Sequence, residues 1–338
     1  MDRNRRAALS VAAALLAVLI ISQWRLRGPT PKSLNAPGNQ FSAMRAFEAE
    51  RATIGGRKPH PIGSAENRAI RDRIIARFES LGYETRLQRT FACDSHVNCA
   101  TVENIIARTP DQLSGPTVLL SAHYDSVAAG PGASDDGTGV AALLEIARIA
   151  RTERFRNPIT FLIDDGEEAG LLGAEGFVAD KSASGSIAAV INLEARGTSG
   201  TSYLFETSPN NRWFLPLVAN ALPHPVTTSL FFSIYELLPN DTDLTVFKRA
   251  GFAGVNFAYL RNVDFYHTPF DNIDHVDLRS LQHHGDNALA ALRALGNTDL
   301  RRTREGNSVT SPPWGDATNH GHSGPAELEV AIRTHSNT

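Results

Sequence analysis

Four short apolar runs constrain the fold of this chain more than any other feature. They cover residues 117–122, 159–163, 188–193 and 254–260. Continuous apolar runs of this length are typical of strands that are buried on both faces, as in parallel sheets. Apolar residues at helical spacing lie between the first two runs, over residues 139–150. Strands that alternate with helices predict an α/β fold with a mixed, mostly parallel central sheet flanked by helices.

Further elements are predicted on either side of these runs. Residues 64–81 have a helical pattern, and Gly82 is placed to end that helix. Residues 83–90 and 102–107 follow as two strands, which we expect to pair antiparallel. A last helix is predicted over residues 278–295.

The N-terminal segment has the pattern of a membrane-targeting sequence. Arg3, Arg5 and Arg6 precede an uncharged run over residues 7–22. No convincing small-x-small cleavage site follows, so we interpret residues 1–27 as a signal anchor, with a cleaved signal peptide as the alternative. Arginines before the apolar run keep the N-terminus in the cytoplasm. The domain that follows would then lie in the periplasm or outside the cell, and it would be secreted if the segment is cleaved.

Composition sets the domain boundaries and excludes one class of partner. We expect a linker over residues 28–40, one large domain over residues 41–297, and a polar, disordered tail over residues 298–338. The formal net charge is −3, and no basic block is long enough to bind a nucleic-acid backbone. Nucleic acid is therefore not an expected partner.

Cys93 and Cys99 are the only cysteines. Outside the cytoplasm two cysteines this close in sequence would form a small-loop disulfide. A pair of metal thiolates is the alternative, but it would need further ligands nearby, and His96 alone is a poor candidate.

Acidic residues and histidine follow the apolar runs directly. The carboxyl ends of parallel strands share one edge of a sheet, so these side chains should converge on one site. Any one carboxylate alone would be a helix cap or a solvated surface group. Several together at the ends of buried strands repel one another and are costly to desolvate, a cost that divalent cations remove. The residues are His123 and Asp125 after the first run, Asp164, Asp165, Glu167 and Glu168 after the second, and Glu194 after the third.

Imidazole and carboxylate ligands without thiolates suit Zn²⁺, with Mn²⁺ or Co²⁺ as substitutes. Two such ions bridged by one carboxylate form a known hydrolytic arrangement, in which a carbonyl is polarised and the pKa of a water is lowered. Metal-assisted hydrolysis is therefore the reaction class that we infer.

Five short motifs resemble those of the zinc aminopeptidases of peptidase family M28. They occur in the family's order across roughly residues 60–295, which makes the resemblance specific. The resemblance implies a zinc metallopeptidase with the three-layer zinc-exopeptidase architecture. The motifs are SAHYDS at residues 121–126, GASDDGTG at 132–139, DGEEAGL at 165–171, NLEARG at 192–197 and YHTP at 266–269.

The resemblance also implies a ligand set for two zinc ions per chain. By position in the motifs, His123 and Glu194 would hold one ion, and Glu168 and His267 would hold the other. Asp135 would bridge both ions.

The same resemblance assigns catalytic roles. Glu167 would be the general base that takes a proton from the attacking water and returns it to the leaving amine. Tyr266 would hydrogen-bond the oxyanion. Asp125 is placed to orient His123 from behind, with a strand-end cap as its alternative. The implied substrates are peptides with a free N-terminus, whose amine would lie near Glu167 and Glu194.

Several neighbouring residues have two interpretations. Arg196 would either receive a substrate carbonyl or pair with Glu206. Asp241 and Asp243 lie either close to the cleft or in a turn that caps a helix.

Three other positions are secondary in this scheme. Asp271 would either orient His267 or cap a helix. Asp136 would begin the next helix rather than bind metal. The pair at residues 283–284, two histidines on the last predicted helix, is expected at the surface.

Two rival functions share this scaffold. Glu at position 194, where many secreted bacterial aminopeptidases of the family have Asp, resembles a membrane-linked branch similar to endoplasmic reticulum metallopeptidases, and also the glutaminyl cyclases. A glutaminyl cyclase resembles a one-metal enzyme. A non-catalytic receptor-type domain is the third possibility, but such domains can lose ligands or the base, and all six positions are filled here.

Overall fold

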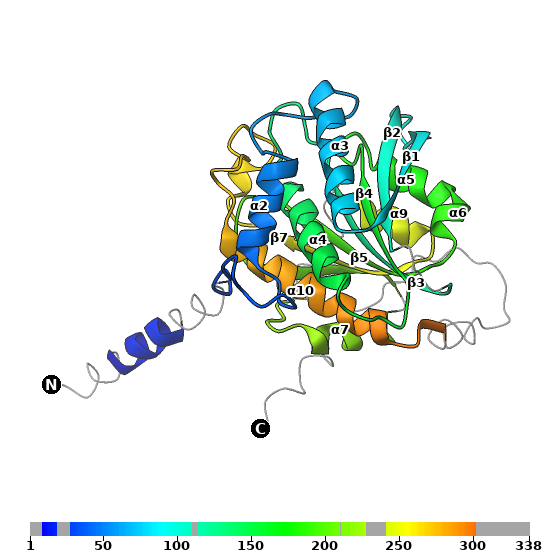
Figure 1. The fold of residues 1–338 in the computed structure, drawn as a ribbon. Coiled ribbons are helices and arrows are strands. Elements are labelled where there is room, and N and C mark those ends of the chain that lie inside the picture. Colours follow the sequence, from blue (N-terminus) through cyan, green and yellow to red (C-terminus); the bar gives the residue numbers. More distant parts are fainter. Residues whose placement is uncertain (1–8, 19–27, 110–113, 210, 228–240, 302–338) are drawn as a thin grey trace, which may run out of the picture.

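A seven-stranded sheet runs through the centre of the molecule (Figure 1). The structure is a computed structural model, and it describes residues 9–18, 28–109, 114–209, 211–227 and 241–301. The strand order is β1-β2-β4-β3-β5-β7-β6. The strands are β1 (Glu84–Cys93), β2 (Cys99–Arg108), β3 (Thr117–His123), β4 (Ile159–Asp164), β5 (Ile187–Ala195), β6 (Tyr203–Thr207) and β7 (Ala253–Tyr259).

The four apolar runs form the four central strands β4, β3, β5 and β7, and each neighbouring pair among them is parallel. Every residue of β3, β4 and β5 is buried, as expected for a sheet that is covered on both faces. The outer strands are antiparallel, because β1 pairs with β2, β2 with β4, and β6 with β7 in that sense. The predicted mixed, mostly parallel sheet is therefore confirmed.

Helices cover both faces of the sheet. Successive residues of a strand point to opposite faces, so Val118 and Leu120 of β3 pack into the core beneath α4 and α10, while Leu119 packs into the core beneath α5 and α9. The helices are α2 (Ala43–Thr53), α3 (Ala65–Ser80), α4 (Gly137–Ala150), α5 (Leu172–Ala179), α6 (Lys181–Ser184), α7 (Leu215–Ala221), α9 (Asp243–Arg249) and α10 (Leu278–Asn297).

Local signals explain where two of the predicted helices begin and end. Ser64 caps α3 by accepting a hydrogen bond from the amide of Asn67, and Gly82 follows this helix with a φ of 82°. Helix α4 begins two residues earlier than its apolar pattern, because the side chain of Asp136 accepts a hydrogen bond from the amide of Gly139. Asp136 thus begins this helix, as predicted.

The segment over residues 28–40, predicted as a linker, packs along α10 and α2. The amide of Lys32 donates to the side chain of Gln282 at 2.8 Å, and its ammonium lies 3.1 Å from Asp286. The guanidinium of Arg45 donates to the carbonyls of Leu34 and Ala36. The start of the domain is therefore attached to its last helix.

Both ends of the chain are described only in part. Residues 9–18 of the expected signal anchor are helical, and its remaining residues lie outside the described ones. Within the described ranges we find no helix with the length and apolarity needed to cross a membrane. Leu300 is buried in the main core, and the expected tail from residue 302 onward lies outside the described residues.

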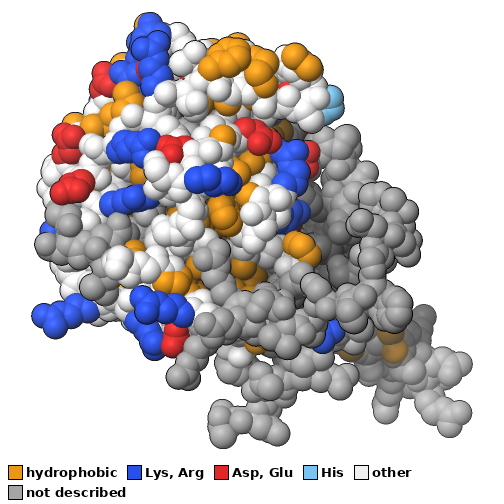
Figure 2. Space-filling view, turned by 90° about the vertical axis from the view of Figure 1, so that its right-hand side faces the viewer, with side chains coloured by type: hydrophobic (Ala, Val, Ile, Leu, Met, Phe, Trp, Pro, Cys, Tyr) orange, Lys and Arg blue, Asp and Glu red, His pale blue; other side chains and the backbone are white. Residues whose placement is uncertain are grey.

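A hairpin of β1 and β2 forms one edge of the sheet, and Cys93 and Cys99 are joined by a disulfide at its tip. Figure 2 shows the side of the molecule to which this edge belongs, with charged side chains of both signs interspersed and hydrophobic side chains gathered along its upper rim. The exposed large hydrophobic side chains of the hairpin are Leu87, Phe91 and Val97.

The predicted surface position of residues 283–284 is wrong. His283 and His284 are 2% and 0% exposed, because the loop that contains Ser202 covers this part of α10. The hydroxyl of Ser202 lies 3.0 Å from Nδ1 of His284, and its amide donates to Nδ1 of His283 at 3.3 Å. Burial lowers the pKa of His284 to about 3, so this imidazole is neutral at physiological pH.

Candidate metal centre

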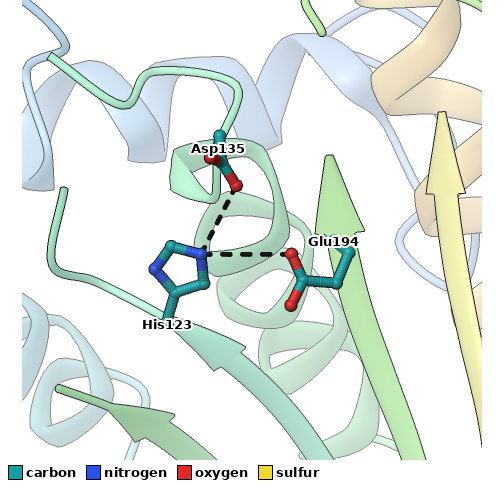
Figure 3. Close-up of side chains that lie close together, drawn as sticks. All are labelled: His123, Asp135 and Glu194. Atoms are coloured by element: carbon teal, nitrogen blue, oxygen red, sulfur yellow. Dashed lines mark ion pairs between the residues drawn. The ribbon is translucent and has the colours of Figure 1, made fainter. Parts of the chain in front are cut away.

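Three predicted ligands meet at the carboxyl ends of the central strands (Figure 3). His123 is the last residue of β3, Glu194 lies at the end of β5, and Asp135 lies in the loop before α4. Nε2 of His123 is 3.4 Å from Oδ1 of Asp135 and 4.0 Å from Oε2 of Glu194. The side chains of all three residues are buried. We call this group the strand half of the centre.

A second group shares Asp135 and is supplied by loops. Nε2 of His267 lies 3.2 Å from Oδ2 of Asp135 and 3.0 Å from Oε2 of Glu168. Within each of the two groups, one ligand atom per residue lies within 4.8 Å of the others. We call Glu168 and His267 the loop half. A third possible group consists of His123, Glu167 and Glu168.

Each of the five predicted ligands has a buried polar atom without a hydrogen-bond partner. Leaving such an atom unsatisfied costs about 1–3 kcal/mol, and more when it is charged, so native structures rarely gather several of them in one place. Cations at this position would satisfy all five, and imidazole nitrogen with carboxylate oxygen is a donor set that suits zinc. The atoms are Nε2 of His123, Oδ2 of Asp135, Oε1 of Glu168, Oε1 of Glu194 and Nε2 of His267.

The pKa values of these carboxylates also indicate negative charge that nearby groups of the protein do not neutralise. Burial raises the pKa of Glu194 and of Glu167 well above the ordinary value, and it raises the pKa of Glu168 to about 7. Burial also opposes ionisation of Asp135, but the close approach of the imidazoles of His123 and His267 outweighs it and lowers the pKa of Asp135 to about 2. The protein alone therefore does not neutralise the negative charge that it gathers here.

Asp125 supports both halves. Its main-chain carbonyl accepts a hydrogen bond from Nδ1 of His123 at 3.0 Å. A carbonyl can only accept, so Nδ1 carries the proton and the lone pair of Nε2 faces the centre. The carboxylate of Asp125 lies 3.5 Å from Nδ1, and it accepts the amides of Glu167 and Glu168 at 3.0 and 3.3 Å. Asp125 thus contacts His123 mainly through its main chain, and its side chain positions the neighbouring glutamate loop.

Asp271 positions the shared ligand rather than His267. Its two carboxylate oxygens accept the amides of Ser134 and Asp135 at 2.7 and 3.1 Å. Neither alternative from the sequence, orientation of His267 or helix capping, includes this contact. No sequence signal could have found it, because the two segments are 136 residues apart.

Tyr266 and Arg196 lie beside the loop half. The ring of Tyr266 stacks on the imidazole of His267 with the centroids 3.7 Å apart, and the guanidinium of Arg196 lies over the Tyr266 ring at 5.5 Å. Arg196 does not pair with Glu206, which pairs with Lys248 of α9 instead. That alternative for Arg196 is therefore wrong.

Asp243 lies close to the centre, whereas Asp241 is exposed. Asp243 is 1% exposed, and its carboxyl group interacts electrostatically with that of Asp164, which follows the second apolar run. Burial raises the pKa of Asp243 to about 6 and the pKa of Asp164 well above the ordinary value. The two carboxyl groups therefore share a buried position behind the strand half.

Fold and site together define an α/β protein with a candidate metal centre at the carboxyl edge of a parallel sheet. Residues 104–292 match peptidase family M28, and the chain belongs to this family. It is 30% identical over 318 residues to endoplasmic reticulum metallopeptidase 1 of Rattus norvegicus, in an alignment that covers 87% of this chain and 35% of that protein. The chain thus spans about a third of the length of the curated relatives it matches first. The predicted family and branch are confirmed.

Solved structures share the fold. A zinc aminopeptidase from Bacillus subtilis superposes with a TM-score of 0.63 at 17% identity, covering 77% of this chain and 96% of that one. The glutaminyl cyclase of Porphyromonas gingivalis superposes with a TM-score of 0.60 at 24% identity, covering 75% of this chain and 98% of that one. At these identities the similarity shows the architecture alone.

Proposed function

We propose that this chain is a dinuclear zinc aminopeptidase that removes N-terminal residues from peptides. His123 and Glu194 would hold one zinc ion, Glu168 and His267 would hold the other, and Asp135 would be shared by both. One observation carries the proposal: two groups of possible ligands share Asp135, and every member has a buried polar atom without a hydrogen-bond partner. Bound zinc would polarise the scissile carbonyl and lower the pKa of a water at the site.

Glu167 is the general base in this proposal. Its side chain is 12% exposed, and Oε2 lies 4.0 Å from Nε2 of His123, at the edge of the centre. Burial raises its pKa well above the ordinary value, so it can hold a proton between the two steps. It takes a proton from the attacking water and delivers it to the leaving amine nitrogen.

Tyr266 stabilises the oxyanion that forms on the former carbonyl oxygen. Burial raises the pKa of its phenol, so the hydroxyl stays protonated and can donate a hydrogen bond. Stacking on His267 fixes the ring beside the loop half.

The free N-terminus of the substrate is recognised by charge. The carboxylates of Glu167 and Glu194 lie on the same side of His123, each 4.0 Å from its Nε2. An ammonium group placed between them gains charge-assisted hydrogen bonds.

We place the domain outside the cytoplasm, anchored by the N-terminal segment. The arginines before residues 7–22 support this orientation, and a disulfide between Cys93 and Cys99 is stable only under oxidising conditions. Thiol titration of the unfolded, unreduced protein, exported by its own leader, should find almost no free cysteine. Two reactive thiols contradict this location.

A glutaminyl cyclase is the second candidate. The group of Asp135, Glu168 and His267 could hold one metal ion by itself, which is all that such an enzyme would need. The buried unpartnered atoms of His123 and Glu194 favour a second ion and therefore the peptidase. A receptor-type domain is less favoured still, because the ligands and the base are all present.

The deciding experiment combines metal analysis with blocked peptides. The full chain should bind about two zinc ions, and it should cleave peptides with a free N-terminus but not their N-acetylated forms. Cleavage of the N-acetylated peptides alone indicates a carboxypeptidase. Cyclisation of N-terminal glutamine with about one zinc ion per chain indicates the cyclase. Asp135→Asn serves as the inactive control, because it removes charge from the ligand that both halves share.

A further inference from the structure

Arg196 has a cationic side chain that has no role in the proposed reaction. It follows β5, two residues after Glu194, and its amide donates to the carbonyl of Tyr259 at 2.9 Å, which fixes the backbone beside the centre. The side chain is half-buried. Within the described part of the chain its guanidinium makes no hydrogen bond or ion pair to a side chain or carbonyl.

Contact with Tyr266 holds this guanidinium next to the reacting groups. It lies 5.5 Å from the centroid of the Tyr266 ring, which stacks on His267 at 3.7 Å. A cation over an aromatic ring uses its flat face. Contact with a ring occupies only the face of a guanidinium, because its N–H groups point outward in its plane and can still donate to a ligand.

The available donors favour a carboxylate over a carbonyl. A guanidinium fork matches the two oxygens of a carboxylate, and such charge-assisted pairs are roughly twice as strong as neutral hydrogen bonds. Two other half-buried arginines of this chain have such a partner, because Arg45 pairs with Glu145 and Arg71 pairs with Glu103. Arg77 and Arg108 are half-buried without an ion pair among the described residues, but neither lies beside the candidate centre. Arg196 has the same donors, and no acid among the described residues forms an ion pair with them.

We propose that Arg196 binds the terminal carboxylate of the residue that is released, which makes dipeptides the preferred substrates. The proposal rests on the peptidase function proposed above. One residue of extended chain spans about 3.3–3.6 Å. A carboxylate one residue beyond the scissile bond therefore comes within reach of a guanidinium that lies one aromatic ring away from His267. Longer peptides place a neutral amide at this position and lose the paired charge.

The test compares two forms of the same dipeptide, one with a free C-terminal carboxylate and one with a C-terminal amide. Both forms have a free N-terminus. Wild-type enzyme should favour the free acid over the amide by roughly ten- to a hundredfold in kcat/KM, mostly through KM. Arg196→Gln should abolish this preference, measured as the ratio of kcat/KM for acid and amide within the same variant, while zinc content stays near wild type. Arg196→Lys keeps the charge without the fork, so its preference should be intermediate.

Arg154→Gln is the matched control. Arg154 is exposed, and together with Ile159 at the start of β4 it lines a cavity at the other end of the strands from the centre. This variant loses the same charge and should keep the full preference for the free acid. Equal cleavage of acid and amide by the wild type, or a preference that survives in Arg196→Gln, overturns the proposal.

Failure of the proposed function gives a different result. If the zinc-loaded wild type cleaves neither dipeptide, the peptidase assignment fails. Calorimetric binding of the same acid and amide then decides the role of Arg196. Tighter binding of the acid by wild type but not by Arg196→Gln supports the carboxylate site, and equal binding rules it out.

Discussion

The ligands of the strand half lie at the ends of strands of the sheet, whereas the ligands of the loop half lie in turns. His123 and Glu194 stand at the ends of β3 and β5, and their side chains are 1% and 8% exposed. Glu168 and His267 lie in turns, with side chains 9% and 36% exposed. His267 also has a φ of 58°, a left-handed conformation that few residues other than glycine adopt. The hydrogen bonds of the sheet fix the positions of the strand ligands, whereas the positions of the loop ligands depend on a few local contacts.

The largest expected effect separates the two adjacent glutamates. Glu167→Gln keeps the size of the side chain but removes the base, so turnover should fall by about 10²- to 10⁴-fold while zinc content stays near wild type. Glu168→Gln replaces an anionic ligand of the loop half by a neutral one and should lose zinc as well as activity. Elemental analysis and hydrolysis of an unblocked aminoacyl substrate measure both. Loss of zinc in Glu167→Gln would mean that it is a ligand, as the third possible group allows.

The second prediction contrasts the two histidines. His267→Ala should reduce zinc to about one ion per chain, and it should destabilise the metal-free protein less than His123→Ala does, because this side chain is partly exposed. His123→Ala should also lose zinc, and it should destabilise the metal-free fold by about 1–3 kcal/mol, because it empties a fully buried position. Urea unfolding in chelator gives the comparison. Equal destabilisation by both variants contradicts the division into halves.

The third prediction concerns the carboxylates behind the ligands. Asp125→Asn disturbs the amides of Glu167 and Glu168, whereas Asp271→Asn disturbs the amide of the shared ligand Asp135. Such supporting groups are worth about 10- to 100-fold in metal affinity. In titrations with buffered zinc, Asp125→Asn should weaken mainly one of two binding steps, and Asp271→Asn should weaken both. A single weakened step in Asp271→Asn argues against Asp135 as the shared ligand.

The sequence predicted the elements and ligands that depend on local pattern. The apolar runs locate the four central strands because a strand that is buried on both faces must be apolar throughout. Strand ends then locate His123 and Glu194 without further information. His267 has no comparable signal, because its turn follows no apolar periodicity, and only the resemblance to the family indicates it.

Three of the misses depend on contacts between distant segments. Glu206 pairs with Lys248, not Arg196, because α9 packs over β7 and brings the lysine to β6. His284 is buried because Ser202 comes from a loop 82 residues away in sequence. The short strand β6 was not predicted, because its position depends on pairing with β7. Tertiary packing decides which distant segment each of these residues contacts, and no local sequence pattern indicates it.

The smallest effect that we predict is a pH dependence of the metal-free protein. Burial raises the pKa of Glu168 from 4.5 to about 7, so between these values the unfolded chain gives up this proton first, and stability falls as pH rises. Burial lowers the pKa of His267, but the close approach of the carboxylates of Asp135 and Glu168 outweighs it and raises the pKa from 6.5 to about 9. The stability from protonated His267 is complete below pH 6.5 and is lost toward pH 9, although solvent screening reduces it.

Both residues of the loop half therefore lower the stability of the metal-free protein as pH rises. Zinc binds the deprotonated ligands, so the stability of the zinc-bound protein should instead increase with pH. In chelator, the melting temperature should fall by a few degrees from about pH 5 to about pH 9, and the stabilisation by added zinc should grow over the same interval. Glu168→Gln should flatten the lower part of the curve, between pH 4.5 and about 7, and weaken the upper part, because Glu168 contributes to the raised pKa of His267. If the melting temperature of the chelated protein rises with pH, the charge balance inferred for the loop half is wrong. If Glu168→Gln leaves the lower part intact, the slope there comes from the strand half, where burial raises the pKa of Glu194 in the same sense.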